Sequence, residues 1–245
     1  ARLTITDRIA RADMPFTTLS GDHTLVYNGE IYNFKTLRRN YSLPERTCCD
    51  TEVLAELFEK KGYKSIQDLN GIYAFAIYDN RNHQLTIGRD PLGIKPLYYM
   101  KIGQLLYFSS EIKPLLLFRG SENSVNKDTI ANYLFNSIYD HSEETFYSNI
   151  RQLPPGHILE TKNTKVYVKK AYDYDVPRFE GSYQDAVELF YTSSKTAISH
   201  QTDTDLGLSV NISGGNDSRL LLSLLADTNR LQNIEGTYTY SYSNF

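Results

Sequence analysis

Two closely spaced pairs of strand patterns between residues 71 and 108 constrain the fold most. Residues 71–78 are rich in β-branched and aromatic side chains, and a polar turn at 79–82 separates them from a second strand pattern at 84–88. Residues 97–100 and 104–108 flank another short turn. Such short connections join antiparallel strands, because parallel strands need long crossover connections. The sequence therefore predicts a mainly antiparallel sheet structure here.

Helical patterns interrupt these strands. Residues 50–61 form the clearest helix, with apolar side chains on one face, acidic residues early, lysines late and Gly62 as a stop signal. The remaining predicted elements are strands at 23–27, 157–161 and 165–169 and helices at 34–39, 111–118 and 128–138.

The connections change after residue 170. A polar, irregular segment lies at 171–181. Ser182 and Asp185 follow it with the spacing of a capping box, which predicts a helix that runs to about residue 200. A strand at 206–212, a tight loop at 213–218, a helix at 219–226 and a strand at 236–242 then predict a βαβ unit. We assign residues 1–178 and 179–245 to two domains. Because two strands are too few for a stable domain, we expect the second one to be incomplete.

Charge and cysteine content exclude several functional classes. A net charge of −3 and a pI near 6.0 give no basic surface for a nucleic acid. No apolar run approaches the length of a membrane span and no leader peptide is recognisable, so we expect no membrane and a cytoplasmic location. Cys48 and Cys49 are neighbours, which excludes a disulfide framework, and the scattered histidines predict no zinc site.

The loop Ser213-Gly214-Gly215-Asn216-Asp217-Ser218 lies between a predicted strand and a predicted helix. Backbone N–H groups and a helix N-terminus converge on such a loop, which suits an anion. The alternative is a plain turn whose glycines satisfy the backbone dihedral angles. The strand–loop–helix order favours the phosphate site.

This loop resembles the pyrophosphate loop S-G-G-x-D-S of the ATP pyrophosphatases, which cleave ATP between its α and β phosphates. The resemblance implies ATP and Mg²⁺ as cofactors, with Asp217 as a metal ligand. Asn216 and Arg219 depart from the residues usual in asparagine synthetases, which leaves the acceptor substrate open. The residues implied to bind ATP are Asn211, Ser213, Gly214, Gly215, Asp217, Ser218 and Tyr240.

Residues before this loop resemble the class II glutamine amidotransferase domain of asparagine synthetases. The longest matching strings are Tyr27-Asn28-Gly29-Glu30-Ile31-Tyr32-Asn33 and residues 88–99, and further matches lie at 2–7, 50–53, 69–71, 75–79 and 109–113. The resemblance implies an α+β N-terminal-nucleophile αββα sandwich, incomplete at its N-terminus, followed by the start of an α/β adenine-nucleotide-binding domain.

In this family the nucleophile is an N-terminal cysteine whose own α-amino group is the base. The sequence begins inside the matched domain, so we expect this fragment to lack the nucleophile and to be inactive as a glutaminase. Cys48 and Cys49 have no free α-amino group and are predicted to be structural. Cys49 stands where the family usually has a helix-capping Ser, so we expect a weaker cap.

The resemblance also implies a glutamine site. Asn28 and the N–H of Gly29 form the oxyanion hole, Arg2 binds the glutamine carboxylate, and Glu30 and Asp50 contact polar groups of the substrate. Backbone groups of Leu3, Thr4, Ile5 and Thr6 line the site. Taken singly, Arg2 is also compatible with a surface charge, Asn28-Gly29 with a turn and Asp50 with a helix cap. Arg89 and Asp90 are predicted to form structural pairs that support the site.

The implied reaction is ATP-dependent, glutamine-hydrolysing asparagine synthesis. Glutamine amide hydrolysis releases ammonia, which amidates an acyl-adenylate, so that aspartate, ATP and glutamine give asparagine, AMP, pyrophosphate and glutamate. One alternative is another carboxylate acceptor, such as a polysaccharide sugar or a β-lactam precursor, and another is a non-catalytic amidotransferase-like module. The expected partners are small molecules (glutamine, ATP, and aspartate or another carboxylate), and a homodimer is left open.

Overall fold

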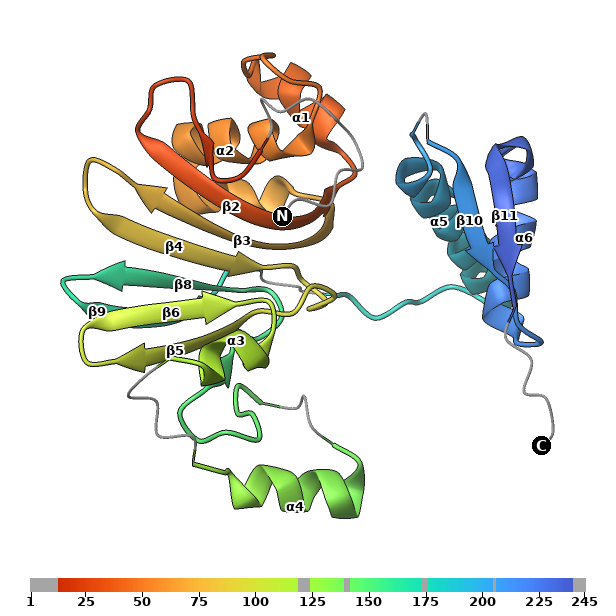
Figure 1. The fold of residues 1–245 in the computed structure, drawn as a ribbon. Helices are drawn as coiled ribbons and strands as arrows, with labels where there is room; N and C mark the ends of the chain where they lie inside the picture. Colours follow the sequence, from red (N-terminus) through yellow and green to blue (C-terminus); the bar gives the residue numbers. More distant parts are fainter. Residues whose placement is uncertain (1–12, 119–123, 139–141, 173–175, 205, 240–245) are drawn as a thin grey trace. The chain divides into compact units, whose positions relative to one another are not determined.

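The computed structural model of the protein describes residues 13–118, 124–138, 142–172, 176–204 and 206–239 (Figure 1). The chain separates into two compact units, Ala1–Tyr174 and Asp175–Phe245, which are described one by one below. The sequence placed the corresponding division between residues 178 and 179. None of the helices within the described ranges is both long and apolar enough to cross a membrane.

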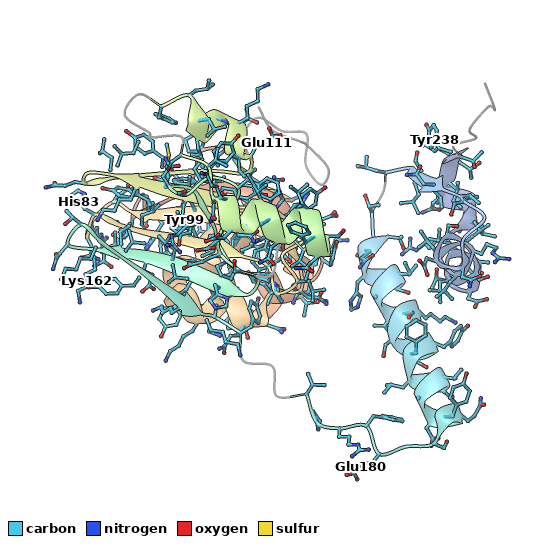
Figure 2. All side chains as sticks on the ribbon, turned by 90° about the horizontal axis from the view of Figure 1, so that it is seen from below. His83, Tyr99, Glu111, Lys162, Glu180 and Tyr238 are labelled. Atoms are coloured by element: carbon cyan, nitrogen blue, oxygen red, sulfur yellow. The ribbon has the colours of Figure 1, made fainter. Side chains whose placement is uncertain are left out.

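Unit 1 is built on a six-stranded antiparallel sheet with the strand order β1-β2-β3-β4-β8-β9. The predicted hairpin is present, because β3 pairs with β4 from Ala74 opposite Arg89 to Asp79 opposite Gln84. Its turn, near His83, and the β8–β9 turn, near Lys162, lie at the same end of the sheet (Figure 2). The strands are β1 (Phe16–Thr17), β2 (His23–Ile31), β3 (Gly71–Asp79), β4 (Gln84–Arg89), β8 (His157–Lys162) and β9 (Lys165–Lys170).

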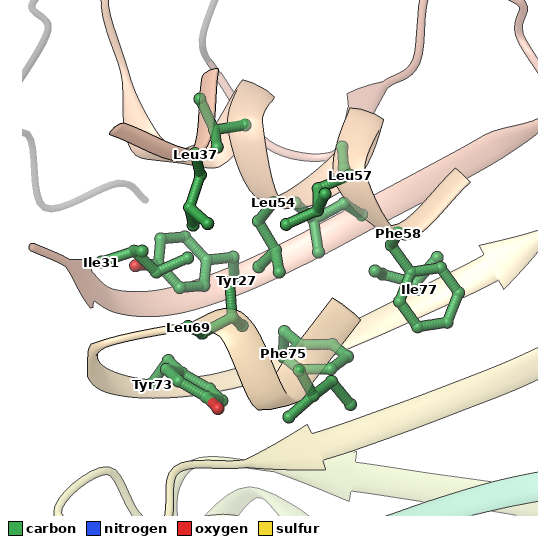
Figure 3. Close-up of a cluster of buried hydrophobic side chains, with 14 of the residues drawn as sticks. Tyr27, Ile31, Leu37, Leu54, Leu57, Phe58, Leu69, Tyr73, Phe75 and Ile77 are labelled. Carbon is green, nitrogen blue, oxygen red and sulfur yellow. The ribbon is translucent and has the colours of Figure 1, made fainter. Parts of the chain in front are cut away.

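Helices α1 (Phe34–Tyr41) and α2 (Asp50–Lys61), followed by the 3-10 helix η2 (Gly62–Asp68), cover one face of this sheet (Figure 1). The apolar face of α2 packs on odd-numbered residues of β2 and β3, because alternate strand residues point to the same face. Each large apolar side chain buried in this way contributes about 1.5–3 kcal/mol. The core includes Tyr27, Ile31, Leu54, Leu57, Phe58, Tyr73, Phe75 and Ile77 (Figure 3).

The opposite face of the sheet packs against a second, three-stranded antiparallel sheet with the order β6-β5-β7. Its strands are β5 (Tyr98–Ile102), β6 (Leu105–Ser109) and β7 (Arg151–Gln152). Ala74 and Ala76 of β3 meet Leu97 and Tyr99 between the two sheets. Strand β3 is therefore buried on both faces.

Helix α3 (Ile112–Leu116) packs on the outer face of the second sheet through Leu115, which is buried with Met100 and Ile150. The layers of unit 1 thus follow the predicted order of helix, sheet, sheet and helix. Helix α4 (Lys127–Asn136) comes next in the chain, and the Asn126 side chain caps it by accepting a bond from the Thr129 N–H.

Unit 2 contains α5 (Tyr183–Gln201), β10 (Leu208–Asn211), α6 (Asn216–Asp227), η3 (Leu231–Asn233) and β11 (Ile234–Tyr238). Strands β10 and β11 are parallel and α6 connects them, as the sequence predicted. The capping box of α5 is also present, since Ser182 Oγ accepts from Asp185 N and an Asp185 carboxylate oxygen accepts from Ser182 N.

The start of α6 corrects the sequence analysis, which placed residues 213–218 in a loop. The helix begins at Asn216 instead, so that Asn216, Asp217 and Ser218 form its first turn. Gly215 is the N-cap residue, with extended dihedral angles of φ −74° and ψ 160°. Asp217 then lies where a negative charge interacts favourably with the helix dipole.

Candidate functional site

The last third of β2 carries three of the predicted site residues. Asn28 lies opposite Ala74, and Gly29 lies opposite Tyr73. Asn28 and Gly29 are therefore strand residues, which excludes the alternative that they form a turn. Asn28 is exposed, whereas Gly29 and Glu30 are partly buried. Five predicted site residues, Arg2, Leu3, Thr4, Ile5 and Thr6, lie outside the described residues.

The N–H of Gly29 points to the edge of β2 that faces away from β3. Just beyond the strand, Tyr32 N donates to Asn70 O across the β2–β3 pair at 2.8 Å. The N–H groups of Tyr27 and Ile31 instead donate to side chains that do not belong to β3. Because backbone N–H groups alternate along an antiparallel strand, Gly29 shares the direction of Tyr27 and Ile31. Its N–H is thus not used in the β2–β3 ladder.

Gly29 is also a place where two backbones approach closely. A Cβ atom at this position would lie 2.2 Å from the Ile72 carbonyl oxygen and 2.6 Å from Tyr73 Cα. A similar contact occurs at Gly71, where a Cβ atom would lie 2.1 Å from the Glu30 carbonyl oxygen. Glycine is required at both positions, because no rearrangement of a flexible side chain would relieve these contacts with backbone atoms.

The Asn28 side chain lines a hollow of about 350 Å³ between the two sheets. Apolar residues such as Val26 and Phe108 form much of its wall, and Ser109 and Ser110 add hydroxyl groups beside Asn28. Small-molecule sites commonly combine apolar walls with a few polar groups, in volumes of roughly 300–1,000 Å³. The hollow formed by the described residues is therefore of a size suited to a small ligand.

Asp50 connects α2 to the site strand. Its carboxylate, on a residue that is only 5% exposed, accepts bonds from Tyr27 Oη at 2.7 Å and Ile31 N at 3.0 Å. Burial raises the pKa of Asp50, while these two donors oppose that rise. Asp50 is the first residue of α2 and Cys49 is the N-cap, so the alternative of Asp50 as the cap is wrong.

Cys49 caps α2 without a side-chain hydrogen bond, which confirms the predicted weaker cap. Its backbone has the extended conformation of an N-cap residue, with φ −103° and ψ 159°. The buried sulfur lies 3.0 Å from Thr47 Oγ1. Cys48 is exposed, and both cysteines precede a helix.

Glu30 lies in the field of several charges. Burial raises its pKa first, the negative charge of Asp50 raises it further, and the positive charge of Lys95 lowers it. Lys95 was not identified from the sequence as a site residue. Its backbone is held on both sides, because Lys95 N donates to Asp90 Oδ2 at 2.9 Å and Lys95 O accepts from Arg89 Nε at 2.8 Å.

Arg89 and Asp90 support the site through the backbone of the loop at 91–95. The Asp90 carboxylate is fully buried and accepts from three N–H groups of this loop, while the Arg89 guanidinium donates to carbonyl oxygens. The partners of both side chains in these bonds are backbone groups, whereas the sequence analysis expected structural pairs. The groups bound are the N–H groups of Leu92, Ile94 and Lys95 and the carbonyl oxygens of Gly93, Lys95 and Leu153.

In unit 2 the predicted phosphate loop connects β10 to α6. Ser213 and Ser218 face each other across it, with their hydroxyl oxygens 3.1 Å apart, and Ser213 Oγ accepts from Gly215 N at 3.2 Å. Asp217 is exposed in the first turn of α6. The structure brings Ser213, Gly214, Gly215, Asp217 and Ser218 to one helix N-terminus, a suitable place for an anion. Asn211 ends β10, and Tyr240 lies outside the described residues.

Asn216 and Arg219, which depart from the residues usual in asparagine synthetases, contact each other at this loop. An Arg219 Nη2 hydrogen is donated to Asn216 Oδ1 at 2.6 Å, and Arg219 Nε donates to Gly215 O at 3.3 Å. Within the described parts of the chain, no group of three or more His, Cys, Asp or Glu side chains converges on one point. Asp217 is accordingly the carboxylate at the loop that could contribute to a magnesium site shared with phosphate oxygens.

Sequence reasoning also missed the partnership of Tyr27 with Asp50. The alternation of side chains along a strand could have indicated this bond. Tyr27 precedes Asn28 and therefore points to the opposite face, where α2 packs. No comparable signal indicated Lys95, whose position depends on the loop at 91–95.

A model of the glutamine amidotransferase domain family matches residues 1–173. Asparagine synthetase B (glutamine-hydrolyzing) of Escherichia coli is 31% identical over 91% of this chain and 36% of its own length. Asparagine synthetase (glutamine-hydrolyzing) 3 of Bacillus subtilis is 29% identical over 91% of this chain and 37% of its own. The chain thus spans less than half of either relative. A solved glutamine phosphoribosylpyrophosphate amidotransferase of B. subtilis aligns with 92% of this chain and 48% of its own, at 17% identity and a TM-score of 0.46.

Proposed function

Because the chain belongs to the glutamine amidotransferase domain family and is homologous to asparagine synthetases, we propose that its protein carries out ATP-dependent, glutamine-hydrolysing asparagine synthesis. Unit 1 contributes to the hydrolysis of the glutamine amide. Unit 2 contributes to ATP binding for the amidation of an acyl-adenylate. The net conversion turns aspartate, ATP and glutamine into asparagine, AMP, pyrophosphate and glutamate.

The direction of the Gly29 N–H is the observation that carries the first half of this proposal. Attack on the glutamine amide places negative charge on its side-chain oxygen, and fixed N–H donors stabilise that charge. Gly29 offers an N–H outside the β2–β3 ladder, and Asn28 offers a side-chain amide beside the hollow. The glycine contacts fix the strand backbone, so the donor is positioned before the substrate binds.

The surrounding charges suit an amino-acid substrate. Glu30 and Asp50 are acidic groups close to the proposed oxyanion donors and would attract the α-amino group of glutamine. The nucleophile implied by the family resemblance is an N-terminal cysteine. Cys49 is buried against Thr47 and Cys48 lies before α2, so neither is proposed to replace it.

The second half rests on the loop at the N-terminus of α6. Its N–H groups, the Ser213 and Ser218 hydroxyls and Asp217 are suited to hold a pyrophosphate group with magnesium. Asn216 and Arg219 depart from the residues usual in asparagine synthetases, so a second candidate is an enzyme of the same type that amidates a different carboxylate acceptor. Assays with aspartate and with other carboxylates would distinguish the two acceptors.

Substitution of Asn28 tests the glutaminase proposal in the full-length protein. Asn28→Ala should lower glutamine-dependent synthesis about a hundred- to a thousandfold, because losing one oxyanion donor costs about 2.7–4 kcal/mol. Synthesis from added ammonium salts should persist, since it bypasses this step. The measurement is the ratio of the glutamine-driven rate to the ammonia-driven rate at equal amounts of folded protein, and an unchanged ratio would refute the role of Asn28.

Two matched variants complete this experiment. Asn82 occupies the β3–β4 turn, where it donates to Asp79 at 2.7 Å, so Asn82→Ala should leave the ratio unchanged. Asp217→Ala should lower synthesis from either nitrogen source and preserve glutamine hydrolysis. Normal ATP turnover in Asp217→Ala would show that the loop does not bind ATP as proposed.

A further inference from the structure

Two buried tyrosine hydroxyls form a short hydrogen-bonded chain at the end of unit 1. The Tyr172 hydroxyl donates to Ile66 O and also contacts the Tyr73 hydroxyl. Because the single hydroxyl hydrogen of Tyr172 is used on Ile66 O, Tyr73 must be the donor in the second bond. Tyr73 is fully buried and Tyr172 is 8% exposed, so these bonds form away from water, where they are strengthened.

Tyr73 is the residue against which the proposed oxyanion strand rests. It lies opposite Gly29, and the close contact between the two backbones involves Tyr73 Cα. No ladder hydrogen bond joins this pair, as the alternation of N–H groups along β2 requires. The backbone of Tyr73 instead bonds to Asp90, which follows β4. The Tyr73 carbonyl accepts from Asp90 N at 2.8 Å, and the Tyr73 N–H donates to Asp90 Oδ2 at 3.3 Å. Packing against Tyr73, together with the neighbouring pairs Asn28–Ala74 and Glu30–Ile72, therefore sets the position of Gly29.

Tyr172 is itself held from several directions. Its backbone N–H donates to Gly156 O at 3.3 Å, next to a bond of 2.8 Å from Ala171 N to the same oxygen. Gly156 N donates to Asp90 O at 2.9 Å, and Gln67 Nε2 donates to Ala171 O at 3.2 Å. Ala171 and Tyr172 are thus bound both to the 3-10 helix η2 and to the turn before β8. These bonds fix Tyr172, whose hydroxyl contacts Tyr73.

We propose that Tyr172 is a positioning residue of the glutamine site, acting through Tyr73 on the N–H of Gly29. The proposal rests on the proposed role of Asn28 and Gly29 in glutamine hydrolysis. Without the Tyr172 hydroxyl, Tyr73 loses this acceptor and Ile66 O loses this donor, so the Tyr73 ring can shift. A shift of Tyr73 would move the strand contact that fixes Gly29.

Tyr172→Phe in the full-length protein tests this role, because it keeps the ring and removes only the hydroxyl. We expect kcat for glutamine hydrolysis to fall about tenfold, the effect of one misplaced hydrogen bond on a transition state. KM for glutamine and the ammonia-driven rate should stay within about twofold of wild type, since a donor of the transition state is affected and the substrate contacts are not. An unchanged kcat, or an equal fall in the ammonia-driven rate, would overturn the proposal.

Tyr41→Phe is the matched control. Tyr41 packs against the same hydrophobic core and donates its hydroxyl to Asp68 at 3.0 Å. Its loss should lower the melting temperature without changing kcat for glutamine hydrolysis. A fall in kcat like that of Tyr172→Phe would show that any lost core hydroxyl has the same effect, which contradicts a specific positioning role.

The hydrogen-bonded chain supplies a second variant. Tyr73→Phe breaks the same bond between the two hydroxyls and leaves the bond from Tyr172 to Ile66 intact, so it should lower kcat about as much as Tyr172→Phe. A normal kcat in Tyr73→Phe would contradict an action of Tyr172 through Tyr73. The Asn28→Ala ratio separates the two proposals: if it falls while Tyr172→Phe is normal, only the positioning role fails, and if it does not fall, the oxyanion site itself fails.

Discussion

At the scale of single residues, the charge of Asp50 has opposite consequences for stability and for binding. Burial raises its pKa above the ordinary value of 3.8, although Tyr27 and Ile31 donate bonds to its carboxylate. An acid with a raised pKa holds its proton more tightly in the folded state than in the unfolded state. Its contribution to stability is therefore complete below pH 3.8 and is lost as pH rises through the folded pKa.

Asp50→Asn removes this charge and keeps an oxygen that accepts from Tyr27 and Ile31. We expect the free energy of unfolding at pH 7 to be unchanged or higher than in wild type, and the difference to shrink near pH 4. In the full-length protein KM for glutamine should rise, because the neutral amide no longer attracts an α-amino group. Denaturant unfolding at the two pH values and steady-state kinetics measure these effects. A large loss of stability with an unchanged KM would show that the charge is structural.

How much of the site the sequence could predict also depends on the residue. Asn28, Gly29, Glu30 and Asp50 were identified through family resemblance, whereas the direction of the Gly29 N–H required the pairing of β2 with β3. The bond between Tyr73 and Tyr172 joins residues that are 99 positions apart. No local pattern specifies such a contact, because it depends on how the ends of distant elements pack.

At the scale of elements, α2 and α6 show when local signals suffice. The bounds of α2 agree with the prediction, because acidic residues, lysines and Gly62 mark its two ends. The first turn of α6 consists of Asn216, Asp217 and Ser218, whose side chains are equally common in loops. Only the position of Gly215 as the N-cap shows that these residues are helical.

The cap of α2 gives a prediction at this scale. Cys49→Ser should raise the free energy of unfolding by about 0.5–1 kcal/mol, because a serine hydroxyl at the N-cap can accept a backbone N–H bond that the cysteine does not form. Thr47 should remain in place, since its N–H and hydroxyl both donate to Glu52. Urea unfolding checks this expectation.

Cys48→Ser serves as the control, because Cys48 is exposed and precedes the cap. Its effect should stay within about 0.5 kcal/mol, as for most surface substitutions. A decrease in stability for Cys49→Ser would mean that the contact between its sulfur and Thr47 outweighs the new cap.

At the scale of the whole molecule, the two units differ in how much apolar surface they bury. Unit 1 has three core clusters. Among the described residues of unit 2, the buried apolar side chains are Val210, Leu224 and Leu225, and α5 has no buried residue. This small core agrees with the expectation that a domain with two strands is incomplete.

Hydrogen exchange should reveal this difference in the 245-residue chain. Amides of α5 and α6 should exchange at least about tenfold faster than those of β3 and β4, because local opening costs less where few apolar groups are buried. Mass spectrometry of peptides from both units measures the rates in one sample. Equal protection would show that the small core of unit 2 is as stable as the sandwich.

Gly29 of β2 and Gly71 of β3 also help to specify the register in which the two strands pair. Gly29 faces Tyr73 and Gly71 faces Ile31, so each of these two narrow rungs has one partner without a side chain. A slip by two residues would place Tyr27 or Ile31 opposite Tyr73, where a Cβ atom at the position of Gly29 would collide with the Ile72 carbonyl oxygen and Tyr73 Cα. Residues within β2 and β3 thus specify the register of this strand pair. A change in the length of the segment 32–70 that keeps α2, Asp50 and Ile66 in place should therefore not displace the Gly29 N–H.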